Sequence, residues 1–180
     1  MRLVALPESW RDRALVVTAV AEPERWLSPD DLPQFRFEKQ RYAWMLSRIA
    51  GLELARMRNV PPSLVRSDEL SFSHSGRYGA AAIGERAGID IEVPRVIPRG
   101  AAHLFLTEEE IAVADDCAID NALLHFWCAK EAAWKGHGGA IPTLKRVPLR
   151  LVSETERGLQ FENVETFAGE IFAALTRPTF

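Results

Sequence analysis

The stretch Gly88-Ile89-Asp90-Ile91-Glu92 alternates apolar and acidic residues. Such alternation is typical of a short β-strand with one apolar and one acidic face. Because successive strand side chains point to opposite faces, Asp90 and Glu92 project to the same side. Neighbouring carboxylates repel each other unless a positive charge lies between them, and Mg²⁺, a hard cation that prefers oxygen ligands, is the simplest such charge. An exposed acidic strand face without a metal is the alternative interpretation.

The residues before this stretch predict two more strands. Leu70–Ser73 alternates in polarity and should end in a turn at His74–Gly76. The small residues of Tyr78–Ile83 predict a strand against which another element packs closely. Gly84–Arg86 is then expected to form a hairpin-like reversal that leads into the acidic strand.

A long helix is predicted from Phe35 to about Leu54. One stripe of this helix is apolar and consists of Tyr42, Met45, Leu46 and Ile49. A second stripe beside it consists of Arg41, Trp44 and Arg48, and for Arg48 we favour a solvated position on the basic edge of the helix. The cations Arg36, Lys39 and Arg41 lie close enough along the chain to suggest an anion site, with an ordinary basic surface as the alternative.

The C-terminal half combines helices with further strands. Thr107–Glu110 fits a capping box that starts a helix ending at about Asp116. Asp120 is expected to cap the next helix, which should run to Lys135 and stop at a left-handed Gly136. Three strands should follow, at Val147–Val152, Leu159–Val164 and Glu170–Leu175. With the compact apolar run Ala14–Val20 as a buried strand, this order predicts an α+β fold with two sets of strands and helices.

Composition narrows the class of protein. The chain has 180 residues, of which 47% are hydrophobic and 26% charged, enough for one large domain or two small lobes with a real core. The formal net charge of −3 disfavours a nucleic-acid binder with a dominant basic surface. Two cysteines make no disulfide or metal framework. We find no signal-peptide core or membrane-length apolar run, and we expect a cytoplasmic protein.

The C-terminal part of the helix before Gly136 carries a third carboxylate. Trp127, Glu131 and Lys135 are spaced four residues apart and so share one face, with Lys130 on the adjacent edge. Beside Asp90 and Glu92, these residues would form a metal-and-phosphate site, because Mg²⁺ usually takes few protein carboxylates and completes its shell with phosphate oxygens. A weak surface pair between Glu131 and Lys135 is the alternative.

The Ser73-His74-Ser75 segment does not predict a serine hydrolase. Ser73 and His74 are adjacent on a strand and point to opposite faces, and the chain has no Gly-x-Ser-x-Gly elbow. Hydroxyl, imidazole and turn N–H groups at the end of a strand suit a phosphate better. A purely structural turn is the alternative.

In this order, Ser73–Gly76, Gly88–Glu92 and the pattern Trp127-x-x-Lys130-Glu131-x-x-x-Lys135 resemble the motifs of the 4′-phosphopantetheinyl transferases. The likeness is to the surfactin-synthetase-activating type, which has two similar lobes in one chain, and it covers about Phe35 to Leu151. It implies transfer of the phosphopantetheine arm of coenzyme A to a serine of an apo acyl or peptidyl carrier protein. The other product would be 3′,5′-ADP, as for a holo-acyl-carrier-protein synthase.

The resemblance also implies roles for individual residues. Asp90, Glu92 and Glu131 would hold Mg²⁺, while Lys135 would contact the phosphates and assist the leaving group. His74 would bind the 3′-phosphate of coenzyme A, and Ser73 and Lys130 would support the phosphate cradle. Arg41 resembles the basic residue near the adenine end. Glu131, directly or through a metal-bound water, is the candidate base, and Glu110 is kept outside the metal ligands because capping also explains it.

Two departures from the family pattern concern the adenine end. Relatives often carry Gly-Lys-Pro upstream of the Ser-His-Ser segment, and Asn59–Leu70 contains no such motif. Ser28–Asp31 is acidic where relatives carry lysines. The metal and phosphate residues are untouched by these departures.

The architecture implied is two α+β lobes, residues 1–86 and 87–180, related by an approximate twofold axis with the active site in the cleft between them. We expect a monomer whose partners are coenzyme A and an acidic carrier protein, docked on Arg77, Arg95 and Arg99. Two other functions stay open at this point: a non-catalytic coenzyme A or carrier-protein binder of the same fold, and a metal-dependent pyrophosphohydrolase.

Overall fold

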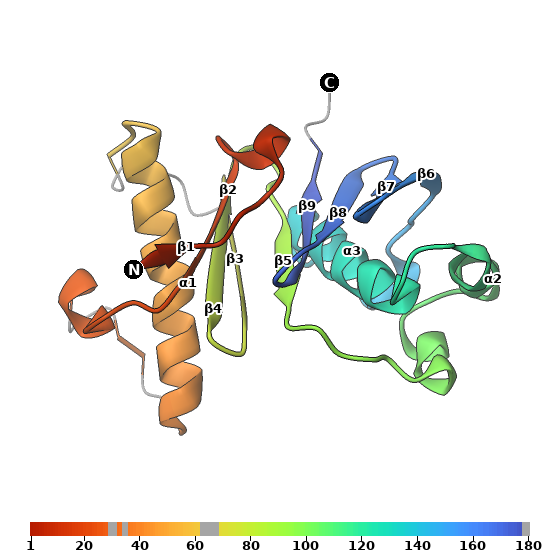
Figure 1. Ribbon diagram of the computed structural model, residues 1–180, viewed down its shortest axis with the longest axis horizontal. Coiled ribbons are helices and arrows are strands. Elements are labelled where there is room, and N and C mark those ends of the chain that lie inside the picture. The colour runs from red at the N-terminus through yellow and green to blue at the C-terminus, as the bar shows by residue number, and fades with distance from the viewer. Residues whose placement is uncertain (29–31, 34–35, 62–68, 178–180) are drawn as a thin grey trace.

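The computed structural model of the chain describes residues 1–28, 32–33, 36–61 and 69–177. Its strands form two antiparallel sheets that lie side by side, each covered by helix, as Figure 1 shows. The predicted mixture of helices and strands is therefore confirmed. Parts of the two stretches that depart from the family pattern, residues 29–31 and 62–68, lie outside the described residues. Among the described helices, none has both the length and the apolar character needed to cross a bilayer.

The first sheet has the strand order β1-β2-β4-β3 and is covered by α1. Its elements are β1 (Arg2–Leu3), β2 (Ala14–Thr18), α1 (Glu38–Met57), β3 (Leu70–Ser75) and β4 (Tyr78–Ile83). The predicted apolar stripe of the helix is confirmed, since Met45, Leu46 and Ile49 are fully buried. Gly79 of β4 allows the close packing, because a Cβ there would lie 2.2 Å from the carbonyl carbon of Leu46.

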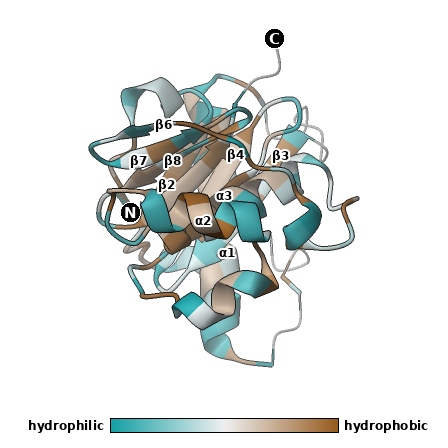
Figure 2. Cartoon of the chain, turned by 90° about the vertical axis from the view of Figure 1, so that its right-hand side faces the viewer, coloured by the Kyte–Doolittle hydropathy of each residue, from teal (hydrophilic) through white to brown (hydrophobic). Residues whose placement is uncertain are grey.

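The second sheet has the strand order β5-β9-β8-β7-β6. Its elements are β5 (Ile89–Glu92), α2 (Glu108–Asp116), α3 (Ala122–Gly136), β6 (Leu151–Thr155), β7 (Gly158–Phe161), β8 (Val164–Ala168) and β9 (Phe172–Thr176). The helix α3 packs on β5, β8 and β9. Figure 2 views the molecule from the side of α2, whose ribbon alternates between hydrophilic and hydrophobic residues. Short 3₁₀ helices lie at Glu8–Trp10, Pro23–Trp26, Arg99–Leu104 and Leu144–Arg146.

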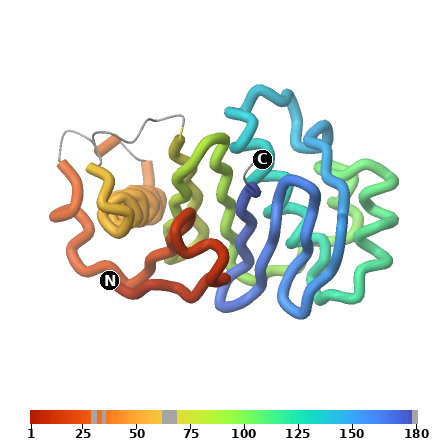
Figure 3. Tube along the Cα trace, turned by 90° about the horizontal axis from the view of Figure 1, so that it is seen from above, coloured from red at the N-terminus to blue at the C-terminus, as the bar shows by residue number. Residues whose placement is uncertain are grey.

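The two sheets meet where β3 runs beside β5, as Figures 1 and 3 show. The two strands share no backbone ladder; instead, the hydroxyl oxygens of alternate serines on β3 accept hydrogen bonds from alternate amides of the β5 segment. The pairs are Ser71 with Ile89 at 3.0 Å, Ser73 with Ile91 at 3.2 Å and Ser75 with Val93 at 3.1 Å. We call this set the serine ladder. Buried apolar residues of both sheets, among them Val16, Ala80, Ile91 and Ala173, pack together beside it.

Three predictions about strands are corrected. The hairpin expected at Gly84–Arg86 is wrong, because β5 pairs with β9 and the chain crosses from one sheet to the other there. The strand predicted at Leu159–Val164 is divided between β7 and β8. The one predicted at Val147–Val152 starts only at Leu151.

The helix ends are correct in part. The capping box is confirmed, because the Thr107 hydroxyl accepts from the Glu110 amide and the Glu110 carboxylate accepts from the Thr107 amide. The cap predicted at Asp120 is wrong: the N-cap of α3 is Asn121, which makes no side-chain capping bond. Gly136 remains helical, and the left-handed residues are Gly138 and Gly139, two and three positions later.

Candidate active site

Asp90 lies on β5 with 6% of its surface exposed. Its Oδ1 atom accepts hydrogen bonds from Ser73 Oγ at 2.9 Å and from Lys135 Nζ at 2.7 Å. Its Oδ2 atom is buried and has no hydrogen-bond partner among the described residues. Burial raises the pKa of Asp90, although Lys135 and Ser73 favour the charged carboxylate. A buried carboxylate oxygen without a partner is costly and is suited to a ligand that brings positive charge.

Glu92 is held by donors on both carboxylate oxygens. Ser75 Oγ donates to Oε2 at 2.8 Å. Trp127 Nε1 and Arg95 Nη2 donate to Oε1 at 3.2 and 3.0 Å. The serine ladder therefore connects twice to the acidic strand, because Ser73 and Ser75 each accept from a backbone amide and donate to a carboxylate.

Glu131 completes the predicted set from α3. It is half-buried, and its pKa is raised first by burial and then by the negative charges of Asp90 and Glu92, against the effect of Lys135. Burial and the same two carboxylates also raise the pKa of the Cys128 thiol, one turn earlier on the helix. Asp90 and Glu92 on β5 thus disfavour the charged form of Glu131 on α3.

The close approach of α3 to β5 brings Lys135 to Asp90. A Cβ at Gly88 would lie 1.9 Å from the carbonyl oxygen of Ala132, so only glycine lets the helix lie this close to the chain. Lys135 Nζ donates to the carbonyl oxygen of Ile89 at 3.0 Å as well as to Asp90. Lys135 thus forms an ion pair with Asp90 across the helix–strand contact, unlike the surface pair with Glu131 that was the alternative interpretation.

No group of three or more His, Cys, Asp or Glu side chains is arranged to hold a metal ion within the described ranges. The donor chemistry nevertheless fits Mg²⁺, which prefers carboxylate oxygens and tolerates few of them. Asp90 Oδ2 is a buried oxygen without a hydrogen-bond partner. The negative charge of Glu92 raises the pKa of Asp90, and the charges of Asp90 and Glu92 raise the pKa of Glu131. The residues present are therefore compatible with the predicted cation.

A hollow of about 310 Å³ adjoins Asp90. It brings together residues from α1, β3, β5 and α3, and its lining includes three basic side chains. The lining residues are Trp44, Ser47, Arg48, Phe72, Ser73, His74, Asp90 and Lys135. Of the predicted coenzyme A residues, Ser73, His74, Asp90 and Lys135 thus share one hollow. Its combination of cations and hydroxyls suits a phosphate.

Lys130 is placed elsewhere than in the phosphate cradle that the resemblance implies. Its ammonium is fully buried and bonds Glu110 Oε1 at 2.7 Å and the carbonyl oxygen of Val147. It lies five positions before Lys135, so the two lysines leave α3 on different sides. This corrects the expectation: Lys130 joins α3 to the start of α2 and does not line the hollow.

Arg41 and Arg48 differ in their relation to the hollow. Arg41 pairs with Glu38 at 3.5 Å and is not among the residues that line the hollow. Arg48, expected on a solvated edge, is half-buried and does line it. The available signal was the spacing of Trp44 and Arg48, which places an aromatic ring one helical turn from a guanidinium.

The model of the 4′-phosphopantetheinyl transferase superfamily matches residues 86–175, which is half of the chain. The chain therefore belongs to this superfamily, whose members transfer the phosphopantetheine arm. The matched residues include Asp90, Glu92, Glu131 and Lys135, whereas His74 and the three serines of the ladder precede the match. No curated protein matches the chain.

Proposed function

We propose that the chain transfers the 4′-phosphopantetheine arm of coenzyme A to a serine of an apo acyl or peptidyl carrier protein, in the manner of the surfactin-synthetase-activating type. Family membership supports phosphopantetheine transfer in general. The observation that carries the finer proposal is the hollow in which His74, Asp90 and Lys135 meet. It joins basic side chains to a carboxylate with a buried, unpartnered oxygen.

In the proposed reaction, the carrier serine oxygen forms a bond to the phosphorus that bears the pantetheine arm. The bond from that phosphorus to the bridging oxygen of the pyrophosphate breaks, and 3′,5′-ADP leaves with the electron pair. Mg²⁺, held by Asp90, Glu92 and Glu131, would neutralise negative charge on the pyrophosphate. Lys135 would stabilise the charge that develops on the leaving phosphate, since its ammonium is already beside Asp90.

The serine proton needs an acceptor. Glu131 is our candidate base, because burial and the neighbouring carboxylates raise its pKa and so its affinity for a proton. Asp90 is less suitable for this step, since its Oδ1 atom already accepts from Ser73 and Lys135 and its unpartnered Oδ2 atom is the oxygen that we assign to Mg²⁺. The proton would pass from the serine hydroxyl to a Glu131 carboxylate oxygen, directly or through a bound water.

We also propose a docking surface for the carrier beside this site, made of Arg77, Arg95 and Arg99. Arg95 pairs with Glu92 of the acidic strand, and Arg99, the first residue of a 3₁₀ helix, pairs with Asp115 of α2. The side chains of Val96 and Leu104 near them are 79% and 69% exposed. Apolar residues among arginines suit a partner with an acidic, partly apolar surface.

The two-lobe organisation, residues 1–86 and 87–180 with an approximate twofold relation, and the monomeric state belong to the same proposal. The apolar packing between the two sheets supports one cooperative unit. A single unfolding transition and a monomer mass in solution are the expected results. Separate transitions for the two parts would contradict a single unit.

Intact-mass measurement on a panel of apo carrier proteins tests the function. With coenzyme A and Mg²⁺, at least one carrier should gain the mass of the phosphopantetheine arm, and 3′,5′-ADP should appear in equal amount. Asp90→Ala should abolish the gain while the protein stays folded. Release of 3′,5′-ADP without modification of a carrier would indicate a pyrophosphohydrolase. Binding of coenzyme A with neither product would indicate a non-catalytic binder.

A further inference from the structure

Another hollow, of about 230 Å³, lies where the chain crosses from the first sheet to the second. Its lining includes two arginines, Arg13 just before β2 and Arg58 just after α1, and we call it the arginine hollow. In Figure 1 it belongs to the upper end of the molecule, where α1 and β9 both end. It shares no lining residue with the hollow beside Asp90, so the two are separate places on the described chain.

The charges of the two arginines are poorly matched by acidic residues. Arg13 is half-buried, and its Nη1 atom lies 4.0 Å from Glu165 Oε1, which is the longest ion pair among the described residues. Arg58 is exposed, and its Nη1 atom donates to the carbonyl oxygen of Ile83 at 3.5 Å, a long and weak hydrogen bond. Burial lowers the pKa of Arg13, and the charge of Arg177 lowers it further against the effect of Glu165. A bound anion would offset this cost of partly burying a cation.

Further positive charge gathers on the other side of Thr176. This residue also lines a smaller hollow of about 110 Å³, together with Arg86, His137 and Arg177. Four arginines therefore lie around one threonine, in a chain whose formal net charge is −3. Among the described residues, Glu85 is the one acidic residue that lines the arginine hollow. The local excess of positive charge favours an anionic ligand.

The arginine hollow is held in shape by bonds between the two sheets. Arg13 Nη2 donates to the carbonyl oxygen of Thr176 at the end of β9. The Thr176 hydroxyl accepts from the Gly88 amide at 2.8 Å and donates to the carbonyl oxygen of Arg86 at 3.1 Å, which fixes the segment that leads into β5. Carbonyl groups orient the Arg13 guanidinium without neutralising its charge. Arg13 is therefore already ordered for an anion, which reduces the entropy lost on binding.

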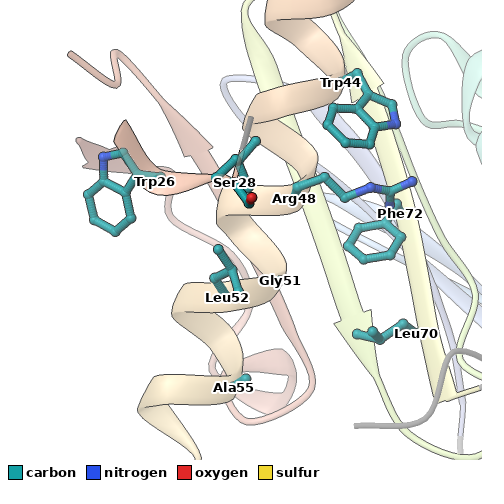
Figure 4. A pocket seen from close by; sticks show the side chains of 10 residues that line it. Trp26, Ser28, Trp44, Arg48, Gly51, Leu52, Ala55, Leu70 and Phe72 are labelled. Carbon is teal, nitrogen blue, oxygen red and sulfur yellow. The ribbon is translucent and has the colours of Figure 1, made fainter. Parts of the chain in front are cut away.

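Arg48 offers a comparison, because it is another half-buried arginine but lines the hollow beside Asp90. Its guanidinium carbon lies 3.8 Å from the centre of the Phe72 ring and 4.8 Å from the centre of the Trp44 ring, an aromatic clamp that Figure 4 shows. The faces of the two rings attract its charge. A variant at Arg48 thus removes a positive charge from the candidate active site and leaves the arginine hollow intact.

We propose that the arginine hollow binds a phosphate group, as the free ion or as a small phosphomonoester, between Arg13 and Arg58. This site goes beyond the proposed function and does not depend on it. A phosphomonoester carries about −1.5 to −2 charges at neutral pH, and its oxygens match the planar fork of a guanidinium. Ala82 and Leu175 add apolar surface on which an ester group would lie. The bound group would join the end of α1 to the crossing segment and β9, and so stabilise the contact between the sheets.

The experiment is a calorimetric titration with inorganic phosphate and with phenyl phosphate, without coenzyme A or Mg²⁺, at an ionic strength held constant with sodium chloride. At least one probe should bind saturably and raise the unfolding temperature. The tighter of the two identifies the source of the phosphate group, free ion or ester. Arg58→Gln should weaken binding about tenfold, the loss expected for one charge-assisted contact, and Arg58→Lys should recover part of it. Without a probe, Arg58→Gln should unfold at the wild-type temperature, since Arg58 is exposed.

Arg56→Gln is the matched control, because it makes the same change in net charge two positions earlier, at an exposed arginine paired with Glu53. Its affinity for the probe should equal that of the wild type. Equal losses in Arg56→Gln and Arg58→Gln would mean a general effect of charge and overturn the site. A loss in Arg48→Met with none in Arg58→Gln would place the anion beside Asp90 and also overturn it. Absence of saturable binding, or an equal effect of added chloride, would do the same.

Discussion

At the scale of single residues, the hydroxyl groups of the serine ladder have two tasks, which are to join the two sheets and to orient the acidic residues. Ser71, Ser73 and Ser75 all accept from a backbone amide of the β5 segment. Ser73 and Ser75 also donate to Asp90 and Glu92, whereas Ser71 has no carboxylate contact among the hydrogen bonds of the described residues. A comparison of Ser71 with Ser73 therefore separates the joining of the two sheets from the orientation of the acidic residues.

Ser73→Ala should weaken both the fold and the response to Mg²⁺. The comparison variant is Ser71→Ala. Removing the hydroxyl of Ser71 or of Ser73 leaves a buried amide without its acceptor, at a cost of about 1–3 kcal/mol in the free energy of unfolding. Only Ser73→Ala also removes one of the two donors to Asp90 Oδ1, so only this variant should need more Mg²⁺ for half-maximal transfer and for thermal stabilisation. Urea unfolding and Mg²⁺ titrations of the two variants make the comparison. A Mg²⁺ shift of equal size in Ser71→Ala would mean that the effect comes from the sheet contact.

At the scale of elements, the buried pair of Lys130 and Glu110 connects α3 to the first turn of α2. The Lys130 side chain has no exposed surface, and burial lowers its pKa while Glu110 opposes that shift. Glu110 also accepts from the amide of Leu149, so the same carboxylate orders the segment before β6. Glu110 therefore links α2, α3 and the segment before β6.

Glu110→Gln should be strongly destabilising. An amide oxygen can still accept from the Thr107 amide, so the cap is preserved, but the buried ammonium loses its counter-charge at a cost of about 3–5 kcal/mol. The double variant Glu110→Gln with Lys130→Met should recover much of this loss, because the unpaired charge is removed as well. Urea unfolding measures both. The exposed neighbour Glu108→Gln is the control and should change stability by less than about 0.5 kcal/mol.

His125 on α3 gives the molecule a pH-dependent stability. The imidazole is fully buried, bonds Thr166 Oγ1 through Nδ1 at 2.8 Å, and lies edge-on to Phe172. Burial lowers its pKa to about 4 from the ordinary 6.5. Between these values the unfolded chain takes up a proton that the folded chain does not, so stability is lost as the pH falls from 6.5 towards 4.

The His125 contribution is measured as the difference between the wild type and His125→Phe. The wild type should lose about 3 kcal/mol more than the variant between pH 7 and pH 4, which is the linkage value for a shift of this size. The raised pKa values of Asp90 and Glu131 act in the opposite direction and are common to both proteins. Parallel curves of unfolding free energy against pH would show that His125 does not titrate in this range.

At the scale of the whole molecule, we propose that recognition of a carrier depends on a basic surface in a chain with a formal net charge of −3. Arg95→Glu would also disturb Glu92, its ion-pair partner, so the change at this position does not test docking alone. Arg77 and Arg99 do not contact the predicted metal ligands in the described hydrogen bonds and ion pairs. These two are the better probes of the proposed surface.

Arg77→Glu and Arg99→Glu should raise KM for the carrier protein several-fold and leave KM for coenzyme A nearly unchanged. The effect should shrink as salt is added, because exposed charges are screened over about 10 Å at 0.1 M salt. Arg150→Glu is the matched control. Arg150 is an exposed arginine that is paired with Glu162 and directly precedes the edge strand β6. Losses that are equal for both substrates, or independent of salt, would exclude these arginines from docking.

The sequence by itself determined the features that depend on local periodicity. The apolar stripe of α1, the capping box of α2 and the strand that carries Asp90 and Glu92 follow from spacings of two, three or four residues. The motif order predicted the superfamily, and the family match confirms it. The spacing of Glu131 and Lys135 also placed both on one face of α3.

Only the tertiary structure decided which distant residues meet. The pairing of β5 with β9 joins residues 80 to 86 positions apart, and the serine ladder joins residues 18 apart without a backbone ladder between their strands. The Lys130 pair and the aromatic clamp on Arg48 likewise require α3 to pack beside α2 and α1 to pack on β3. Sequence periodicity specifies which face of an element is buried, whereas the partner of a buried polar group is selected by packing between elements.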